Sequence, residues 1–173
     1  GGLVRPYRTG GAATRVVALG SVNGTIAEVV DELRDEGVPV GSVSIGAFRP
    51  FPLDALAAAL ADARRVVVIE KNLAPGLGGA LASNVRMALR AHPLPVHTVI
   101  AGLGGRSITR GSLRRVVLAA ERGDLEDVHF LDLDWSAVHR EVARWTERRR
   151  SGPVAENVLR DLSAARPPMS RVV

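Results

Sequence analysis

The residues best suited to chemistry in this 173-residue chain lie in two glycine-rich segments. Residues 70–81 (EKNLAPGLGGAL) follow the apolar run 66–69, and residues 101–109 (AGLGGRSIT) follow the apolar residues 96–100. Short β-branched runs of this kind are typical of strands buried on both faces. Both segments are therefore expected at the carboxyl ends of strands, where ligands and partner surfaces meet in an open α/β sheet.

The first segment has two interpretations. Exposed amides at the start of a helix could hold a phosphate group, with Lys71 as the countercharge and Asn72, Gly76 and Gly79 beside it. However, the segment lacks both the Gly-x-Gly-x-x-Gly order and the Gly-Lys-Ser/Thr ending of a P-loop. The alternative is that glycine lets the helix approach the strand and a neighbouring domain closely. The sequence favours this packing interpretation.

The second segment carries a stronger chemical group in Arg106, accompanied by Gly104, Gly105 and Thr109. A guanidinium is planar, always charged and able to bind a carboxylate or a phosphate through two parallel hydrogen bonds. The residues alone leave a ligand and a partner carboxylate equally open.

The other titratable residues predict neither a catalytic group nor a metal site. Asp132 and Asp134 share one strand face without a third ligand and are interpreted as turn residues at a strand end. There is no nucleophile-elbow pattern for a Ser-His-Asp set. The histidines have no partner at i+4 to form a metal pair; they are His92, His97, His129 and His139.

Composition limits the classes of protein. Hydrophobic residues make up 46%, enough for a core, and the absence of cysteine removes disulfides and thiolate ligands for iron–sulfur clusters. The net charge of +5 comes from scattered arginines with one run, Arg148 to Arg150, so we expect no nucleic-acid partner.

No apolar run approaches the length of a membrane span, and a cytoplasmic location is expected. The start at Gly1, without Met, suggests a fragment.

Periodicity predicts an α/β fold, a three-layer α/β/α sandwich with about five mostly parallel strands. We expect a linker or tail at residues 1–14, one domain at 15–150, and a C-terminal helix with a loose tail at 151–173. The predicted strands are residues 15–20, 40–47, 65–69, 96–100 and 128–133. The first predicted helix begins with a capping box at Thr25 and ends at Gly37. Further helices are predicted at residues 53–61, at residues 78–90 and from Ser112 onward. A last helix is predicted from Ser136, with Val138, Val142 and Trp145 facing inward.

Three motifs in register resemble one family. They are Phe48-Arg49-Pro50-Phe51-Pro52; Lys71-Asn72 with Gly76, Gly79 and Leu81; and Gly102-Leu103-Gly104-Gly105-Arg106 with Thr109. Together they resemble the transketolase-C-terminal-like domain, or domain II, in the alpha subunit of 2-oxoacid (pyruvate):ferredoxin oxidoreductases. The resemblance runs from about residue 15 to residue 117.

The resemblance implies a non-catalytic structural domain of an enzyme that converts a 2-oxoacid and coenzyme A into acyl-CoA and CO2 while reducing ferredoxin. It implies thiamine diphosphate, Mg, iron–sulfur clusters and CoA in the full enzyme, none bound by this domain. The implied partners are the other domains and subunits of an oligomeric oxidoreductase, with ferredoxin reached through the assembly. Two alternatives stay open: the same domain of a transketolase-like or 2-oxoacid dehydrogenase enzyme, and a stand-alone anion- or nucleotide-binding module.

Two positions depart from the family pattern. Ser107 stands where the family usually has an aspartate after the motif arginine, so a salt link through that aspartate is not expected here. Glu70-Lys71 replaces a frequent Asp-Arg pair and keeps both charges. The resemblance favours Arg106 as a residue that orients this domain against the thiamine-binding core.

Overall fold

The computed structural model describes residues 2–147 and 158–159. They fall into two compact units that divide between Leu133 and Asp134. The arginine run at 148–150 and nearly all of the expected C-terminal helix and tail lie outside the described residues. Among the helices that the structure describes, none has the length and hydropathy that a membrane-spanning helix requires.

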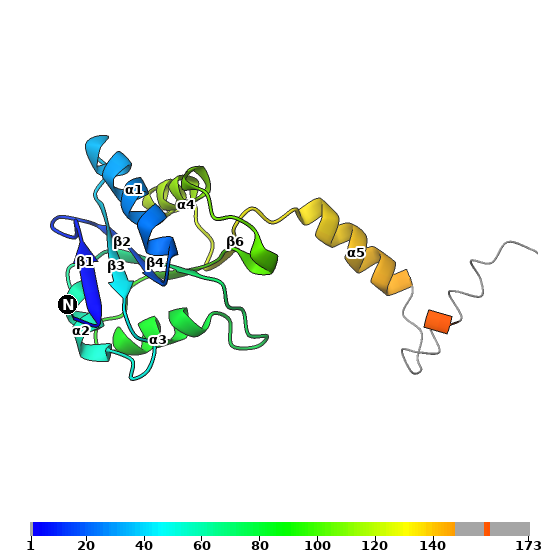
Figure 1. Ribbon diagram of the computed structural model, residues 1–173, viewed down its shortest axis with the longest axis horizontal. Coiled ribbons are helices and arrows are strands. Elements are labelled where there is room, and N and C mark those ends of the chain that lie inside the picture. The colour runs from blue at the N-terminus through cyan, green and yellow to red at the C-terminus, as the bar shows by residue number, and fades with distance from the viewer. Residues whose placement is uncertain (1, 148–157, 160–173) are drawn as a thin grey trace, which may run out of the picture. The chain divides into compact units, whose positions relative to one another are not determined.

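The first unit is built on one six-stranded sheet in the order β1-β3-β2-β4-β5-β6 (Figure 1). All neighbouring strands pair in parallel except β1 and β3, which are antiparallel. The predicted α/β class with a largely parallel sheet is confirmed, with one more strand than expected. The strands are β1 (Val4–Tyr7), β2 (Thr14–Leu19), β3 (Val40–Ile45), β4 (Arg65–Glu70), β5 (Val96–Ile100) and β6 (Val128–Phe130).

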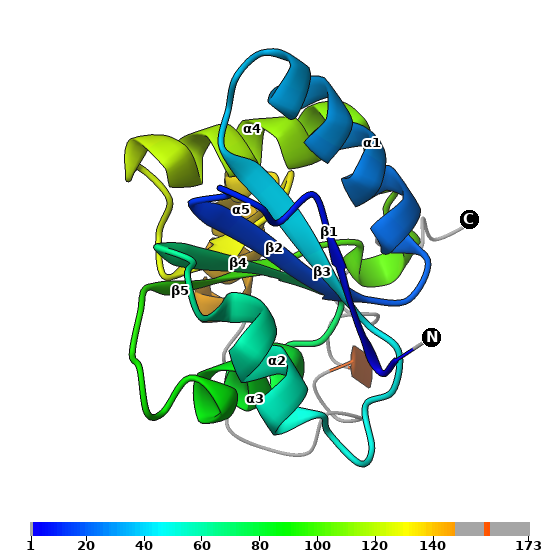
Figure 2. The same cartoon turned by 90° about the vertical axis from the view of Figure 1, so that its left-hand side faces the viewer.

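Two helices cover each face of the sheet, which gives the three layers (Figure 2). The α1 and α4 helices pack together on one face, and α2 and α3 pack together on the other. Alternate residues of β2 explain this arrangement, because Val16 faces the first pair of helices and Val17 faces the second. The helices are α1 (Val22–Asp35), α2 (Leu53–Leu60), α3 (Ala80–Ala88) and α4 (Arg110–Arg122).

The amino-terminal segment is a correction to the expected tail at residues 1–14. It contains β1, which pairs with β3 from Val4 opposite Ile45 to Tyr7 opposite Ser42. The Tyr7 hydroxyl and the Arg8 guanidinium both bond to Asp31 of α1. An edge strand shows no apolar periodicity because most of its side chains are exposed, and Pro6 is tolerated only at such an edge.

Two helix starts also differ from prediction. The α1 helix begins at Val22, so the proposed capping box at Thr25 lies inside it. The α4 helix is capped by Thr109, whose side-chain oxygen accepts from the Ser112 amide, whereas Ser112 is buried within the first turn. Gly37 ends α1 as predicted: it adopts positive φ, and the next amide, Val38, donates to the Leu33 carbonyl.

The helix of the second unit, α5 (Trp135–Glu147), has the predicted position but not the predicted burial. Its start is capped by Asp134, which accepts from the Ser136 hydroxyl and the Ala137 amide. Val142 and Trp145 were expected to face inward, yet Trp145 is 76% exposed and Val142 is also exposed. An amphipathic pattern predicts that one face is suited to burial but does not identify the surface that buries it.

Candidate functional site

The first glycine-rich segment begins at Glu70, the last residue of β4, whose side chain is directed back into the protein. Its two carboxylate oxygens accept from the amides of Leu81 and Ala82, both at 2.9 Å. These amides belong to the first turn of α3, where helix geometry leaves amide donors without partners and favours negative charge. The chain's own carboxylate therefore fills the position that a bound phosphate would take.

Gly79 is needed for space rather than for an unusual backbone angle. It caps α3 with an ordinary φ of −79°, and a Cβ built on it would lie 1.9 Å from Glu70 Oε1. Gly76 has a different role: it adopts a φ of 81° in the tight turn closed by the bridge between Ala74 and Gly78. Gly79 thus permits the close approach of α3 to β4, and Gly76 permits the turn that precedes the helix, which favours the packing interpretation of this segment.

Lys71 and Asn72 are exposed and line a cleft of about 600 Å³. Apolar side chains from several elements form most of its wall, among them Leu19, Phe48 and Ile108. The cleft lies where β2 and β4 end. Because the chain leaves β2 toward β3 on one side and returns as β4 on the other, this is the switch point of the sheet, the usual position of binding sites in open α/β folds.

The second glycine-rich segment follows β5 and contacts the first. A Cβ on Gly102, which adopts positive φ, would lie 3.0 Å from Lys71 Cε, so the lysine stem packs over this glycine. The short 3-10 helix η1 (Leu103–Gly105) follows, with Gly104 and Gly105 also at positive φ. The structure therefore brings Lys71 and the second segment together at one edge of the sheet.

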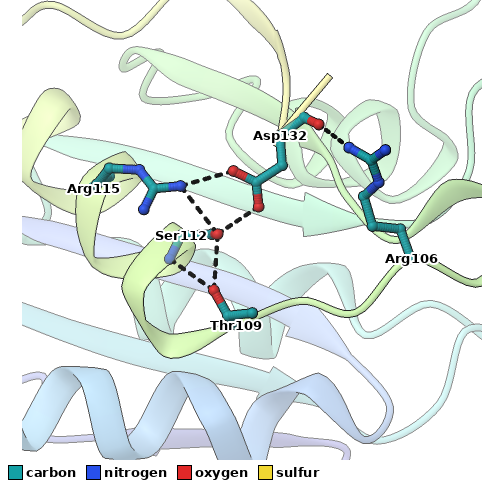
Figure 3. Close-up of polar contacts among 5 residues, drawn as sticks. All are labelled: Arg106, Thr109, Ser112, Arg115 and Asp132. Atoms are coloured by element: carbon teal, nitrogen blue, oxygen red, sulfur yellow. Dashed lines mark hydrogen bonds and ion pairs between the residues drawn. The ribbon is translucent and has the colours of Figure 1, made fainter. Parts of the chain in front are cut away.

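Arg106 donates from Nη1 to the backbone carbonyl of Asp132 (Figure 3). The guanidinium itself is exposed, and a small cavity of about 150 Å³ lies beside it, lined also by Leu103, Phe130 and Leu133. Arg106 has further donors for an external carboxylate or phosphate.

Asp132 connects the second glycine-rich segment to α4 through hydrogen bonds that the sequence did not predict. It adopts a positive φ of 54°, and its carboxylate accepts from the Ser112 hydroxyl and, at 2.7 Å, from Arg115 (Figure 3). The Thr109 and Ser112 hydroxyls lie 2.9 Å apart. With Ser112 buried and no histidine among these contacts, the network positions the loop and offers no activated nucleophile. The sequence indicates Asp132 as a turn residue, but its partners Arg106, Ser112 and Arg115 lie 17 to 26 positions away and have no local signal.

Solved structures with low sequence identity share this fold. A 2-oxoglutarate:ferredoxin oxidoreductase from Magnetococcus marinus matches 66% of this chain and 19% of its own, with a TM-score of 0.50 and 22% identity. A split-gene transketolase matches 69% of this chain and 41% of its own, with a TM-score of 0.52 and 24% identity. The fold is thus of the class found in transketolase-like enzymes and 2-oxoacid:ferredoxin oxidoreductases.

The family follows from the sequence comparison. Residues 12–113, more than half of the chain, match the model described as pyruvate:ferredoxin oxidoreductase core domain II, and the chain belongs to that family. The pyruvate synthase subunit PorA of Methanothermobacter thermautotrophicus is 41% identical over 120 residues, 69% of this chain and 31% of its own. That of Thermotoga maritima is 42% identical over 125 residues, 70% of this chain and 32% of its own. The chain spans about a third of these relatives, and the resemblance seen in its motifs is confirmed.

The residues of this site do not fit the cofactors that the resemblance implies for a whole enzyme. The amino terminus of α3 is filled by Glu70, and a diphosphate there would have to displace a buried carboxylate. Within residues 2–147 and 158–159, no group of three His, Asp or Glu side chains is arranged to hold a metal ion. No reaction step through thiamine diphosphate or magnesium is therefore assigned to these residues.

Proposed function

We propose that this chain is a structural and interface domain of a thiamine-diphosphate-dependent 2-oxoacid (pyruvate):ferredoxin oxidoreductase. The parent enzyme converts a 2-oxoacid and CoA into acyl-CoA and CO2 and reduces ferredoxin. Membership of the core domain II family and the similarity to pyruvate synthase alpha subunits support this parent enzyme. The chain itself takes no catalytic step.

The main support for the interface role is the set of exposed side chains at the carboxyl edge of the sheet. This edge presents Arg106 and Lys71, both exposed, beside two glycine-rich loops. The Glu70 carboxylate accepts from the Leu81 amide, and Arg106 donates to the Asp132 carbonyl. It also exposes leucines that no core contact requires, such as Leu77 and Leu103. Exposed apolar side chains grouped around a guanidinium are typical of protein interfaces.

The cofactors and partners proposed for the parent enzyme are those that the family resemblance implies. Thiamine diphosphate, Mg, iron–sulfur clusters and CoA are held by other domains or subunits of the cytoplasmic, oligomeric enzyme, and ferredoxin is reached through that assembly. The absence of cysteine in this chain agrees with clusters bound elsewhere, because cluster irons are ligated mainly by thiolates. Within the assembly, Arg106 and its neighbours Gly104, Gly105 and Thr109 orient this domain against the thiamine-binding core.

The test is Arg106→Ala in the assembled enzyme. Because Arg106 makes one hydrogen bond to a backbone carbonyl and is exposed, the variant should keep its thermal midpoint within a few degrees. Its affinity for the rest of the oxidoreductase should fall about tenfold or more, measured by titration and size-exclusion chromatography.

Arg90→Ala is the matched control, since Arg90 is exposed beyond the other end of α3, away from the carboxyl edge. It removes the same charge and should leave assembly unchanged. If Arg106→Ala instead unfolds the domain, Arg106 is a structural residue and its interface role is wrong. If both variants assemble like the wild type, the orienting role is wrong.

A further inference from the structure

The cleft between the ends of β2 and β4 has the size of a ligand pocket but the surroundings of a protein interface. Its volume of about 600 Å³ falls within the range of small-molecule sites. Exposed leucines, however, extend well beyond it along the same edge of the sheet. Leu19 ends β2, Leu73 and Leu77 follow β4, and Leu103 follows β5.

The same edge continues over the outer strands. Leu3 lies at this edge because its carbonyl accepts from the Gly46 amide just beyond β3, and Leu133 follows β6. Both leucines are exposed. Elsewhere in residues 2–133, the exposed large apolar side chains are dispersed, namely Tyr7, Met87 and Val128. A small ligand in the cleft would leave most of these leucines in water, whereas a protein surface would cover them together.

The cleft also has a defined charge. Lys71 is the only lysine of the chain, and its stem is held over Gly102. No carboxylate among the described residues forms an ion pair with it. Glu70, beside it in sequence, directs its carboxylate to α3 instead. The cleft is therefore apolar with a positive charge at one side, and its complement is an apolar segment that carries a carboxylate.

We propose that this cleft is the docking site for an apolar, carboxylate-bearing segment from the part of the family's alpha subunit that lies outside the length matched by this chain. The relatives have the chain length to supply it, since this chain covers about a third of them. The apolar side chains of the segment fill the space between Phe48, Ile108 and the exposed leucines, and its carboxylate pairs with Lys71. The inference rests on the proposed interface function and assigns that interface a face and a partner chemistry.

The first experiment maps the contact in the assembled oxidoreductase that contains this chain. A photo-reactive phenylalanine analogue replaces Leu77, which is 65% exposed, and in a control protein it replaces Met87 on α3, away from the carboxyl edge. Crosslinks from position 77 should map by mass spectrometry to one peptide of the alpha subunit outside this chain, containing apolar residues and an Asp or Glu. Position 87 should not reach that peptide.

The second experiment tests the charge. Lys71→Glu should weaken docking about tenfold or more, Lys71→Met should weaken it less, and Met87→Lys should leave it unchanged. Replacing the acidic residue of the crosslinked peptide with Lys should restore binding to the Lys71→Glu variant. Equal docking of the Lys71→Glu and wild-type chains would overturn the proposal, as would crosslinks from 77 to a different subunit. Native mass spectrometry that finds a small molecule in the cleft of the assembled enzyme would overturn it as well.

The two proposals fail separately. If the interface function is wrong, the wild-type chain does not assemble with the oxidoreductase at all. If only the docking site is wrong, the wild-type chain assembles and Arg106→Ala still weakens assembly, while changes at positions 71 and 77 have no effect.

Discussion

At the scale of single residues, Glu70 determines what the first glycine-rich segment does. Its carboxylate is buried and bonded to two amides of α3, so the helix terminus that could bind phosphate is already neutralised from within the chain. Lys71, the next residue, is exposed at the cleft. Adjacent charged residues thus have opposite roles, one in the fold and one at the surface.

Replacing Glu70 should therefore lower the stability of the domain. Glu70→Ala leaves two buried amides without their acceptor, and we expect it to lower the free energy of unfolding by about 1–3 kcal/mol in urea titrations. Glu70→Gln keeps one acceptor oxygen and should lose less. Added sulfate should raise the urea midpoint of Glu70→Ala more than that of the wild type, because the vacated helix terminus can then accept an anion. Equal sulfate effects would contradict the view that Glu70 occupies an anion position.

At the scale of elements, the approach of α3 to β4 depends on the missing side chain at Gly79. An alanine there would place Cβ against the Glu70 carboxylate and within 2.9 Å of Thr98 Cγ2. Either the carboxylate leaves the helix terminus or α3 shifts away from the sheet. The close contact between α3 and β4 thus requires the absence of a side chain at residue 79.

We expect Gly79→Ala to destabilise the domain by about 1–3 kcal/mol, measured by chemical denaturation. Gly24→Ala in α1 is the control, because Gly24 has no positive φ and a Cβ there meets nothing within 4 Å. That substitution should stabilise the domain by about 0.5–1 kcal/mol, since alanine is the better helix former. A tolerated alanine at 79 would mean that the packing does not depend on this glycine.

At the scale of the whole unit, ion pairs tie the amino-terminal segment and the sheet to the helices. The Arg15 guanidinium, buried in β2, holds the pKa of the Asp62 carboxyl below its usual value through a hydrogen bond, and Arg8, followed by Tyr7, does the same for the pKa of Asp31. Arg114 of α4 likewise lowers the pKa of Glu36, just beyond α1. These carboxylates join parts of the chain that are distant in sequence.

A pKa that is lower in the folded protein stabilises the fold above the ordinary aspartate value of about 3.9, and this stabilisation is lost as the pH falls through the folded value. Asp62→Asn should therefore lower the urea midpoint at pH 7, and the difference from the wild type should shrink as the pH approaches 3. Asp127→Asn is the control, because Asp127 is exposed and its carboxylate has no partner in the described part of the chain. A difference for Asp62→Asn that does not change with pH would contradict a role for its charge.

The local sequence pattern was sufficient to predict those features that depend on neighbouring residues in the chain. Val66 to Ile69 predicted a strand buried on both faces, Gly37 predicted a helix end, and three motifs in register predicted the family. The edge strand β1 was missed because its side chains are largely exposed and show no apolar alternation. The inward face predicted for Val142 and Trp145 was wrong because periodicity describes a helix by itself and not what lies against it.

The α/β class, the order of most elements and the positions of both glycine-rich segments at strand ends could be predicted from the residues alone. The contacts that these segments make became known only from the folded structure. Glu70 reaches residues 11 and 12 positions later, and Arg106 reaches the carbonyl of Asp132, 26 positions away. Such contacts depend on how strands and helices are stacked, because a carboxylate or a guanidinium bonds to whatever the fold places within reach. The sequence identifies the charged group, but its hydrogen-bond partner depends on the tertiary fold.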